Sequence, residues 1–353
     1  MNWLDKPIAT ISEQAIQQAN ERQLQLTKPP GSLGKLEELA VLFSAVQKTQ
    51  QPKINKVQIS IFAADHGIAN ENVSAFPQVV TTEMIKNFSR GGAAISVLAK
   101  ELNAELEVID LGTVVDAGEL NGVISNRIAP STENFAQKAA MTKEQLEKAL
   151  NAGVEAVQRA MDTGTHVFIG GDMGIANTTA ATAMASGYLA KAPSELTGAG
   201  TGLDEKGVMH KAKVIEQALA KHNASSLSSI DILRFFGGFE IAALTGAYIS
   251  AAQHGLPVVV DGFIATVAAL AAIKIKPGCD AWFIYAHQSH EQGHRLILEA
   301  LNAEPLVNLN MRLGEGSGAA IVIPLLRQAC ALHANMATFA EAGVSTSDEN
   351  TGE

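Results

Sequence analysis

Residues 166–179 read HVFIGGDMGIANTT, a short apolar run that passes through glycines into an alanine-rich segment. The β-branched and aromatic residues at its start are typical of a buried strand, and the alanines that follow favour a helix. A buried strand that turns directly into a helix is the unit from which parallel sheets are built. This stretch therefore predicts an α/β fold.

The same alternation recurs along most of the chain. Further strands are expected at 57–64, 106–111, 232–236, 258–260 and 282–286. Helices are expected between them, at 141–161, 208–221 and 241–253 among others. The pattern predicts a mostly parallel, doubly wound (Rossmann-like) sheet that is covered by helices on both faces.

Both ends of the chain lack this alternation and favour helices instead. Near the N-terminus, Ser32 is a candidate N-cap, and Leu33, Leu36, Ala40 and Phe43 fall on one helical face. Residues 318–339 form another helical stretch. We therefore expect a small helical domain built from 1–55 plus 319–353, and a large α/β catalytic domain at 56–318.

Composition narrows the possible partners and compartments. The 353 residues include 26 Lys+Arg against 36 Asp+Glu, a net charge of −10, and this acidic balance argues against nucleic-acid or anionic-membrane binding. Two cysteines, Cys279 and Cys330, cannot form a disulfide framework, which indicates a reducing compartment. The N-terminus has no signal-peptide pattern, and the apolar segments 241–252 and 262–275 are too short for a membrane span. We therefore expect a cytoplasmic protein without a membrane span.

Polar or glycine-rich residues follow most of the expected strands. They are Asp65-His66-Gly67, Asp110, Asp172, Asp261-Gly262 and His287. In open α/β sheets, ligands bind just beyond the carboxyl ends of the strands. The architecture thus predicts a site built from these loops, although a strand-end pair such as Asp65 and His66 also commonly caps nearby backbone.

Two glycine-rich loops are candidates for binding phosphate. One is 170–179, where glycines permit close approach and a helix N-terminus offers free N–H groups to an anion. The other is 196–204, which reads LTGAGTGLD and is followed by a helix that carries Lys211. The first loop matches neither a Walker nor a GxGxxG motif, and from its spacing alone a tight strand-to-helix turn with a threonine cap is the simpler interpretation. The second loop is equally compatible with a flexible surface loop.

A third segment places one carboxylate between glycines. Residues 312–318 read RLGEGSG, with Glu315 flanked by Gly314 and Gly316 ahead of an apolar helix. Partial burial would raise the pKa of this carboxyl and make it a usable general base. The alternative is an acid that only complements the dipole of the following helix.

Residues 290–294, HEQGH, fit the HExxH pattern of zinc hydrolases. In that case His290 and His294 would bind the metal and Glu291 would activate water. Gly293 weakens a helix here by about 1 kcal/mol relative to alanine, and no third ligand follows at a suitable spacing. We therefore predict no metal site.

Several motifs together, in this order, carry a resemblance to a known family. They are KPPGSLG at 28–34, ADHG at 64–67, SAFPQ at 74–78, RGGAAI at 90–95, NTT at 177–179, GTG at 200–202, VDGF at 260–263 and RLGEGSG at 312–318. The chain resembles the nicotinate-nucleotide:dimethylbenzimidazole phosphoribosyltransferases over residues 26–339. The resemblance implies transfer of 5-phosphoribosyl from nicotinate mononucleotide to 5,6-dimethylbenzimidazole by a homodimer that needs no metal or organic cofactor.

The resemblance also assigns roles to residues of this chain. It implies that Glu315 is the general base and that Phe76, Pro77, Met84 and Leu313 hold the benzimidazole. It implies that the remaining substrate contacts come from Asp172, Gly174, Asn177, Thr178, Thr179, Gly200, Thr201, Gly202, Lys211, Gly314 and Gly316.

Two positions depart from the family pattern. Asp172 stands where glutamate, one methylene longer, is usual, so its contact with the substrate is either lost or bridged by water. Ala199 stands where a basic residue is common. The second change shifts phosphate binding onto Lys211 and backbone N–H groups. The rival hypotheses are a zinc hydrolase and a protein that binds benzimidazole or a mononucleotide without turnover.

Overall fold

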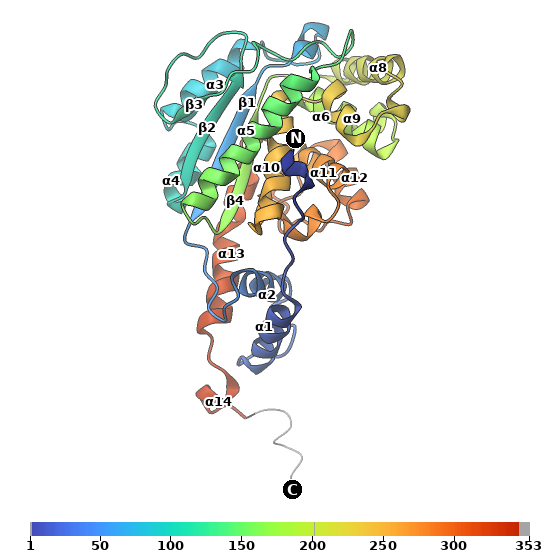
Figure 1. The fold of residues 1–353 in the computed structure, drawn as a ribbon. Coiled ribbons are helices and arrows are strands. Elements are labelled where there is room, and N and C mark those ends of the chain that lie inside the picture. Colours follow the sequence, from blue (N-terminus) through green and yellow to red (C-terminus); the bar gives the residue numbers. More distant parts are fainter. Residues whose placement is uncertain (1, 201, 346–353) are drawn as a thin grey trace. The chain divides into compact units, whose positions relative to one another are not determined.

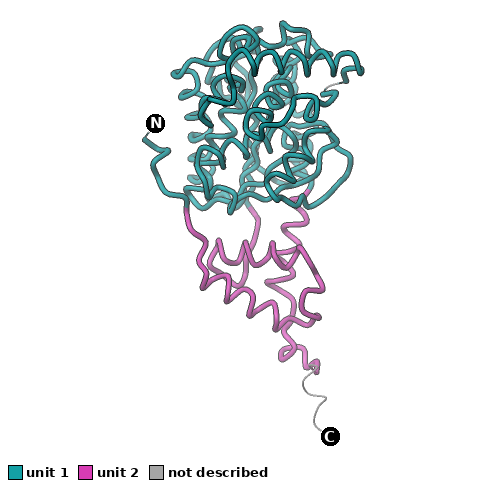
Figure 2. The backbone as a smooth tube through the Cα atoms, turned by 90° about the vertical axis from the view of Figure 1, so that its right-hand side faces the viewer, with its two compact units in different colours: residues 1–8, 56–321 teal, residues 9–55, 322–353 magenta. Residues whose placement is uncertain are grey.

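The computed structural model describes residues 2–200 and 202–345 of the chain. The chain divides into two compact units, one formed by residues 1–8 and 56–321 and the other by residues 9–55 and 322–353 (Figure 2). The larger unit contains a six-stranded sheet, and the described part of the smaller unit is helical.

The larger unit is built on a sheet in which every neighbouring pair of strands is parallel. Its strand order is β3-β2-β1-β4-β5-β6, the doubly wound order, and this confirms the predicted α/β class (Figure 1). The chain order reverses between β1 and β4, where such folds bind their ligands. The strands are β1 Val57–Ala64, β2 Glu105–Gly112, β3 Val123–Ser125, β4 Val167–Met173, β5 Val258–Val260 and β6 Phe283–Tyr285.

Helices cover this sheet. α3 and α4 contact β2, whereas α10 contacts β1 and β4 and packs on α5. Right-handed crossovers place the helices before and after the reversal on opposite faces. The α-helices of this unit are α3 Val79–Ser89, α4 Ala94–Leu102, α5 Lys143–Asp162, α6 Asn177–Leu189, α7 Pro193–Leu196, α8 Glu205–Lys221, α9 Ser229–Phe236, α10 Phe239–His254, α11 Phe263–Ile275 and α12 Gln292–Ala300. Short 3₁₀ helices lie at Asn2–Asp5, Gly67–Glu71, Ala224–Ser226 and Cys279–Trp282.

Close helix packing explains two of the glycines. A Cβ on Gly153 of α5 would lie 1.9 Å from the carbonyl oxygen of Ala243 on α10. A Cβ on Gly246 of α10 would lie 2.2 Å from the carbonyl oxygen of Leu150 on α5. The two helices therefore approach backbone to backbone, which only glycine allows at these positions.

The smaller unit contains α1 Glu13–Gln25, α2 Lys35–Gln47, most of α13 Ser317–Asn335, and α14 Phe339–Ala342. Arg22 of α1 ties the N-terminal and C-terminal segments together, because its guanidinium donates to the carbonyl oxygens of His333 and Ala334 at 2.8 and 3.0 Å. The predicted cap at Ser32 is wrong, because α2 begins after Gly34, which takes the N-cap position. The φ of Gly34 is 54°, a left-handed backbone angle that glycine adopts without strain.

Two strand predictions need correction. Residues 232–236 form the end of helix α9, whose N-terminus is capped by the Ser228 hydroxyl accepting from the N–H of Asp231. Ile232, Leu233 and Phe236 are buried on one face of that helix. The apolar run had suggested a strand because short buried runs have no distinctive period. Conversely, β3 was not predicted, since it has three residues and none of them is buried.

Within the described residues, α13 is the one helix long and apolar enough to cross a membrane, with a mean hydropathy of 1.2. In the structure 56% of that window is buried inside the protein, as in a core helix. The two apolar segments noted in the sequence, 241–252 and 262–275, correspond to the shorter helices α10 and α11.

Candidate active site

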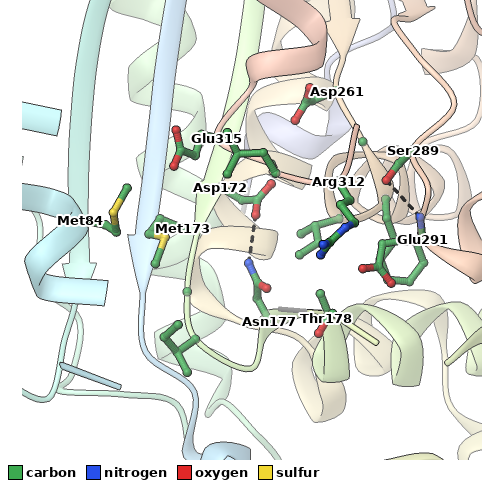
Figure 3. A pocket seen from close by; sticks show the side chains of 18 of the residues that line it. Met84, Asp172, Met173, Asn177, Thr178, Asp261, Ser289, Glu291, Arg312 and Glu315 are labelled. Carbon is green, nitrogen blue, oxygen red and sulfur yellow. Dashed lines mark hydrogen bonds between the residues drawn. The ribbon is translucent and has the colours of Figure 1, made fainter. Parts of the chain in front are cut away.

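A cavity of about 340 Å³ opens at the carboxyl ends of β4 and β5, where the strand-end residues predicted a site. Asp172 and Asp261 lie there, together with the Gly314–Glu315 turn and the start of α6 (Figure 3). The cavity is lined by Phe76, Val80, Met84, Asp172, Met173, Gly174, Ile175, Asn177, Thr178, Gly200, Asp261, Gly262, Phe263, Ile264, His287, Ser289, Glu291, Arg312, Leu313, Gly314 and Glu315.

The turn that carries Glu315 has an unusual backbone. Gly314, Glu315 and Gly316 have φ angles of 88°, 65° and 81°, so three consecutive residues are left-handed. A left-handed residue with a side chain is strained, and such strain is concentrated at functional sites. The turn also lies directly against β4, because a Cβ on Gly171 would lie 2.6 Å from the carbonyl oxygen of Glu315. The sheet thus fixes where the Glu315 side chain begins.

The Glu315 carboxyl is buried and incompletely bonded. One interaction comes from the N–H of Ile95 in the first turn of α4, while Oε2 has no hydrogen-bond partner among the described residues. Burial is the main cause that raises the pKa of this carboxyl, and the nearby charge of Asp261 adds to it. The glycine-framed motif predicted this direction, and a carboxyl with a raised pKa and a free oxygen can accept a proton from a bound molecule.

Two further carboxyls lie at the ends of neighbouring strands. Asp172, near the end of β4, accepts a hydrogen bond from the Asn177 amide at 2.9 Å, and its pKa is raised well above the usual value, first by burial and then by the charge of Asp261. Asp261, after β5, accepts from the N–H groups of Gly316 and Ala319 at 3.2 and 2.8 Å. Burial also raises the pKa of Asp261.

The opposite side of the cavity offers partners to an anion. Thr178 lies in the first turn of α6, and its hydroxyl accepts a 2.7 Å hydrogen bond from Lys211 Nζ. Gly200 lies against this pair, since a Cβ there would be 3.0 Å from Thr178 Oγ1 and 3.5 Å from Lys211 Nζ. Burial lowers the pKa of Lys211 to about 8, and the charge of Glu291 opposes that shift. An anion at Thr178 would meet a helix N-terminus and a hydroxyl group that a buried ammonium group supports from behind.

The mouth of the cavity is apolar on one side and cationic on another. Phe76 and Leu313 line it while remaining 50% and 56% exposed, which is unusual for such large apolar side chains. Arg312 also lines it, with a side chain that remains exposed to solvent (Figure 3). An aromatic ring could lie on this apolar wall, and Arg312 adds a cation to which the sequence motifs had given no role in the site.

Most of the predicted substrate-binding residues line this one cavity, but several do not. Thr179 is fully buried and lies two positions beyond Asn177, about 200° around the helix, so it points away from the cavity. Pro77 and Gly202 are exposed outside it, and Val80 takes the place expected for Pro77. Lys211 acts through Thr178, and Gly316 lies behind the cavity, bonded to Asp261. Thr201 lies outside the described residues.

The HEQGH segment does not form the helix that a zinc site of this type needs. α12 begins at Gln292, so His290 precedes the helix. Both ring nitrogens of His294 are engaged, one with the Thr266 hydroxyl at 2.9 Å and the other with the N–H of Ser289 at 2.9 Å. Burial lowers the pKa of His294 to about 3, which suits a neutral structural residue. Only Glu291 of the segment lines the cavity.

Comparison with known proteins identifies the family. The sequence profile of the family DBI_PRT, described as phosphoribosyltransferase, matches residues 8–344. The chain belongs to this family. Its phosphoribosyltransferase relatives include nicotinate-nucleotide–dimethylbenzimidazole phosphoribosyltransferases from Xanthomonas campestris pv. campestris strain B100 and Pseudomonas putida KT2440. The first is 55% identical over 98% of this chain and 99% of its own length, and the second 54% over 97% and 98%.

Solved structures of the phosphoribosyltransferase family share the fold. One, titled as the nicotinate-nucleotide–dimethylbenzimidazole phosphoribosyltransferase of Thermus thermophilus, is 41% identical with a TM-score of 0.89. It covers 95% of this chain and 99% of its own. A second, titled as CobT from the same organism, is 42% identical with a TM-score of 0.90 and covers 94% and 99%. The resemblance inferred from the sequence motifs is confirmed, and so are the fold and the enzyme class.

Proposed function

We propose that this phosphoribosyltransferase moves the 5-phosphoribosyl group of nicotinate mononucleotide to 5,6-dimethylbenzimidazole, giving α-ribazole 5′-phosphate and nicotinate. The observation that carries the proposal is the buried Glu315 carboxyl, which lines the same cavity as the anion-binding groups and has one oxygen without a hydrogen-bond partner among the described residues. The names of the full-length relatives supply the two substrates.

The nucleotide phosphate binds at the start of α6. Thr178 and the backbone near Gly200 contact it, and Lys211 supports the Thr178 hydroxyl from behind. Arg312 adds a second positive charge at the cavity. These groups hold the sugar in place, so that binding energy from the phosphate orients the reacting carbon.

The benzimidazole lies against the apolar wall formed by Phe76, Met84 and Leu313. A flat apolar slot favours an uncharged aromatic base. When the base covers this wall, it also keeps water from reaching the sugar and competing with the base.

Proton transfer to Glu315 completes the reaction. A ring nitrogen of the benzimidazole attacks the anomeric carbon from the face opposite nicotinate, which inverts the configuration there. The bond from that carbon to the nicotinate nitrogen breaks, and this nitrogen becomes neutral. The ring proton of the benzimidazole passes to the free oxygen of Glu315 as the new C–N bond forms. Carboxylates near the sugar stabilise the positive charge that develops on it.

Mixing the two substrates with the enzyme and following nicotinate release tests the proposal. We expect release only when dimethylbenzimidazole is present, with α-ribazole 5′-phosphate formed in equal amount. Release without the benzimidazole would indicate a nucleotide hydrolase, and binding of both compounds without release would indicate a binding protein. Either result would overturn the proposal.

The family resemblance adds three properties to the proposal: a homodimer, a cytoplasmic location and a reaction that needs no metal or organic cofactor. Sedimentation of the purified enzyme tests the first, and fractionation of cells the second. Full activity after chelation tests the third. Stoichiometric zinc that is required for turnover would favour the hydrolase hypothesis based on the HEQGH segment instead.

A further inference from the structure

The second histidine of the HEQGH segment, His294, is fully buried and connects a helix to a loop of the active site. It lies in the first turn of α12, and its Nε2 is 2.9 Å from the hydroxyl oxygen of Thr266 on α11. Its Nδ1 accepts a 2.9 Å hydrogen bond from the backbone N–H of Ser289, in the loop between β6 and α12. The mechanism above makes no use of this chain of contacts.

The backbone donor settles where the hydrogen of the histidine lies. Because Nδ1 accepts from the N–H of Ser289, it carries no hydrogen, and Nε2 carries the hydrogen that is donated to the Thr266 oxygen. The ring cannot turn or tilt without losing one of these two buried hydrogen bonds. His294 is thus neutral and fixed between α11 and the loop that carries Ser289.

The loop that carries Ser289 is held from two sides. The N–H groups of Gln288 and His290 bond, at 2.9 Å each, to carbonyl oxygens of the 307–311 segment. The N–H of Ser289 lies between them in the chain and bonds to His294 instead. Ser289 is buried, so its N–H would be a buried donor without a partner if the histidine were absent.

The side chain that is fixed in this way belongs to the cavity. Ser289 is 6% exposed and lines the cavity beside Gly262, where a Cβ would lie 3.7 Å from Ser289 Cβ. Its hydroxyl oxygen accepts a 3.3 Å hydrogen bond from the N–H of Glu291. The hydroxyl hydrogen has no acceptor among the described residues, so it can be donated to a bound molecule.

The position of Ser289 favours a contact with the nucleotide over one with the benzimidazole. Met84, which belongs to the wall proposed for the benzimidazole, lies on one side of the cavity, and Ser289 lies on the other (Figure 3). Glu291 also lines the cavity and packs on the 196–204 loop of the anion-binding side, since a Cβ on Gly198 would collide with its Oε2. The serine therefore lies on the side where the phosphoribosyl group is expected.

We propose that the Ser289 hydroxyl donates a hydrogen bond to the bound nucleotide and that His294, supported by Thr266, is the positioning residue that orients this serine. The inference rests on the proposed function, because it takes nicotinate mononucleotide as the ligand. The HEQGH segment then serves the site by fixing the backbone of a binding residue.

Two substitutions of His294 separate positioning from simple packing. The side-chain oxygen of asparagine can replace Nδ1 as the acceptor for the Ser289 N–H, whereas the amide nitrogen of glutamine can replace Nε2 as the donor to Thr266. Equilibrium dialysis of nicotinate mononucleotide against the full-length enzyme, without benzimidazole, measures the dissociation constant. We expect His294→Gln to raise this constant about tenfold, the scale of one hydrogen bond, and His294→Asn to keep it within about twofold.

Further variants test the serine itself. Ser289→Ala removes the donor and should also raise the dissociation constant about tenfold. Adding His294→Gln to it should have no further effect, because the histidine acts through the serine. KM for dimethylbenzimidazole should stay unchanged in all these variants. His290→Asn alters the exposed histidine of the same segment and serves as the control.

Each outcome decides the proposal. An unchanged dissociation constant in Ser289→Ala overturns it, and so does equal weakening by His294→Asn and His294→Gln, which would indicate packing alone. If circular dichroism shows that His294→Gln does not fold, Thr266→Val removes the support of the ring instead, and nucleotide binding as tight as in the unaltered enzyme would overturn the positioning role. Because dialysis involves no turnover, its failure is distinguishable from failure of the proposed reaction, which the nicotinate assay reports.

Discussion

Two regions of the same sheet treat their carboxylates in opposite ways. On β2, Asp110 accepts from Arg127 at 2.9 Å, and Glu107 is held by two hydrogen bonds from Arg159 at 2.8 and 3.1 Å. On β4 and in the glycine turn, Asp172 and Glu315 have no such arginine partner among the described residues. Both groups of side chains come from strands or turns of one parallel sheet.

The difference separates carboxylates that stabilise the fold from carboxyls whose pKa is raised for a role in the reaction. An arginine partner satisfies a carboxylate and keeps it ionised. Burial without an arginine or lysine partner among the described residues instead raises the pKa of Asp172, Asp261 and Glu315, although His287, 3.8 Å from Asp261, opposes the shift there. Clusters of perturbed carboxyls of this kind mark functional sites. We therefore expect substitutions in the two regions to affect different properties.

The largest expected effect is on Glu315. Glu315→Gln removes the proton acceptor and should lower kcat by roughly 10²-fold or more, the scale of a lost general base. Steady-state kinetics measure it, and circular dichroism should show an unchanged fold. Glu107→Gln is the matched control in the arginine-paired region, and its kcat should stay close to that of the unaltered enzyme. An active Glu315→Gln enzyme would remove Glu315 as the base.

Lys211 tests the cationic side of the cavity. Lys211→Met removes the ammonium behind Thr178 and should raise KM for nicotinate mononucleotide about 10- to 100-fold, the worth of a hydrogen bond from a charged group. Lys213→Met, an exposed lysine on the same helix, is the control. An unchanged KM in Lys211→Met would place the phosphate elsewhere.

The ionisation of Lys211 predicts a pH dependence in the unaltered enzyme. Its pKa is lowered to about 8, so the charged form declines as the pH rises through that value. KM for nicotinate mononucleotide should therefore increase above about pH 8 and remain low below it. Initial rates across this range measure the effect, and Lys211→Met should show no such increase.

Asp110 is the corresponding test of the arginine-paired region. Asp110→Asn breaks its bond with Arg127, which is 23% exposed, and should lower the free energy of unfolding by about 2 kcal/mol. Urea denaturation measures the change. kcat should be unaffected, and a large loss of kcat would contradict the division between the two regions.

The smallest effect is expected at the rim of the cavity. Phe76 is half exposed, so Phe76→Ala removes only part of a ring's burial and should raise KM for dimethylbenzimidazole a few-fold, about 1 kcal/mol. Leu309→Ala, an exposed apolar residue that does not line the cavity, is the control. An unchanged KM in Phe76→Ala would move the benzimidazole away from this wall.

The parts of the fold that have a strong sequence pattern were predicted correctly. Fully buried strands such as β1 and the start of β4 are rich in apolar and β-branched residues, although β1 also contains Gln58 and Ser60. Glycines beside an acid marked the Glu315 turn. Residues 232–236 were mistaken for a strand because a five-residue segment with four apolar residues fits a strand or one helical turn equally well. Burial of one helical face and the N-cap at Ser228 stabilise the helix instead of a strand.

The site was predicted less completely than the fold. Motif position predicted Thr178 and Glu315, which both line the cavity, but it cannot show which way a side chain points, so Thr179 was included although the helix turns it away. Arg312 was visible in its motif, yet only the structure shows that it lines the cavity.

The left-handed turn at Gly314, Glu315 and Gly316 also limits which amino acids the chain can carry at these positions. Any L-amino acid with a Cβ is strained in that geometry, so neighbouring positions cannot readily acquire side chains of their own. The Glu315 carboxyl is therefore the side chain that this turn presents, with a glycine on either side of it. An engineer who wishes to install a different proton acceptor would have to change the identity of one residue while leaving the handedness of all three untouched.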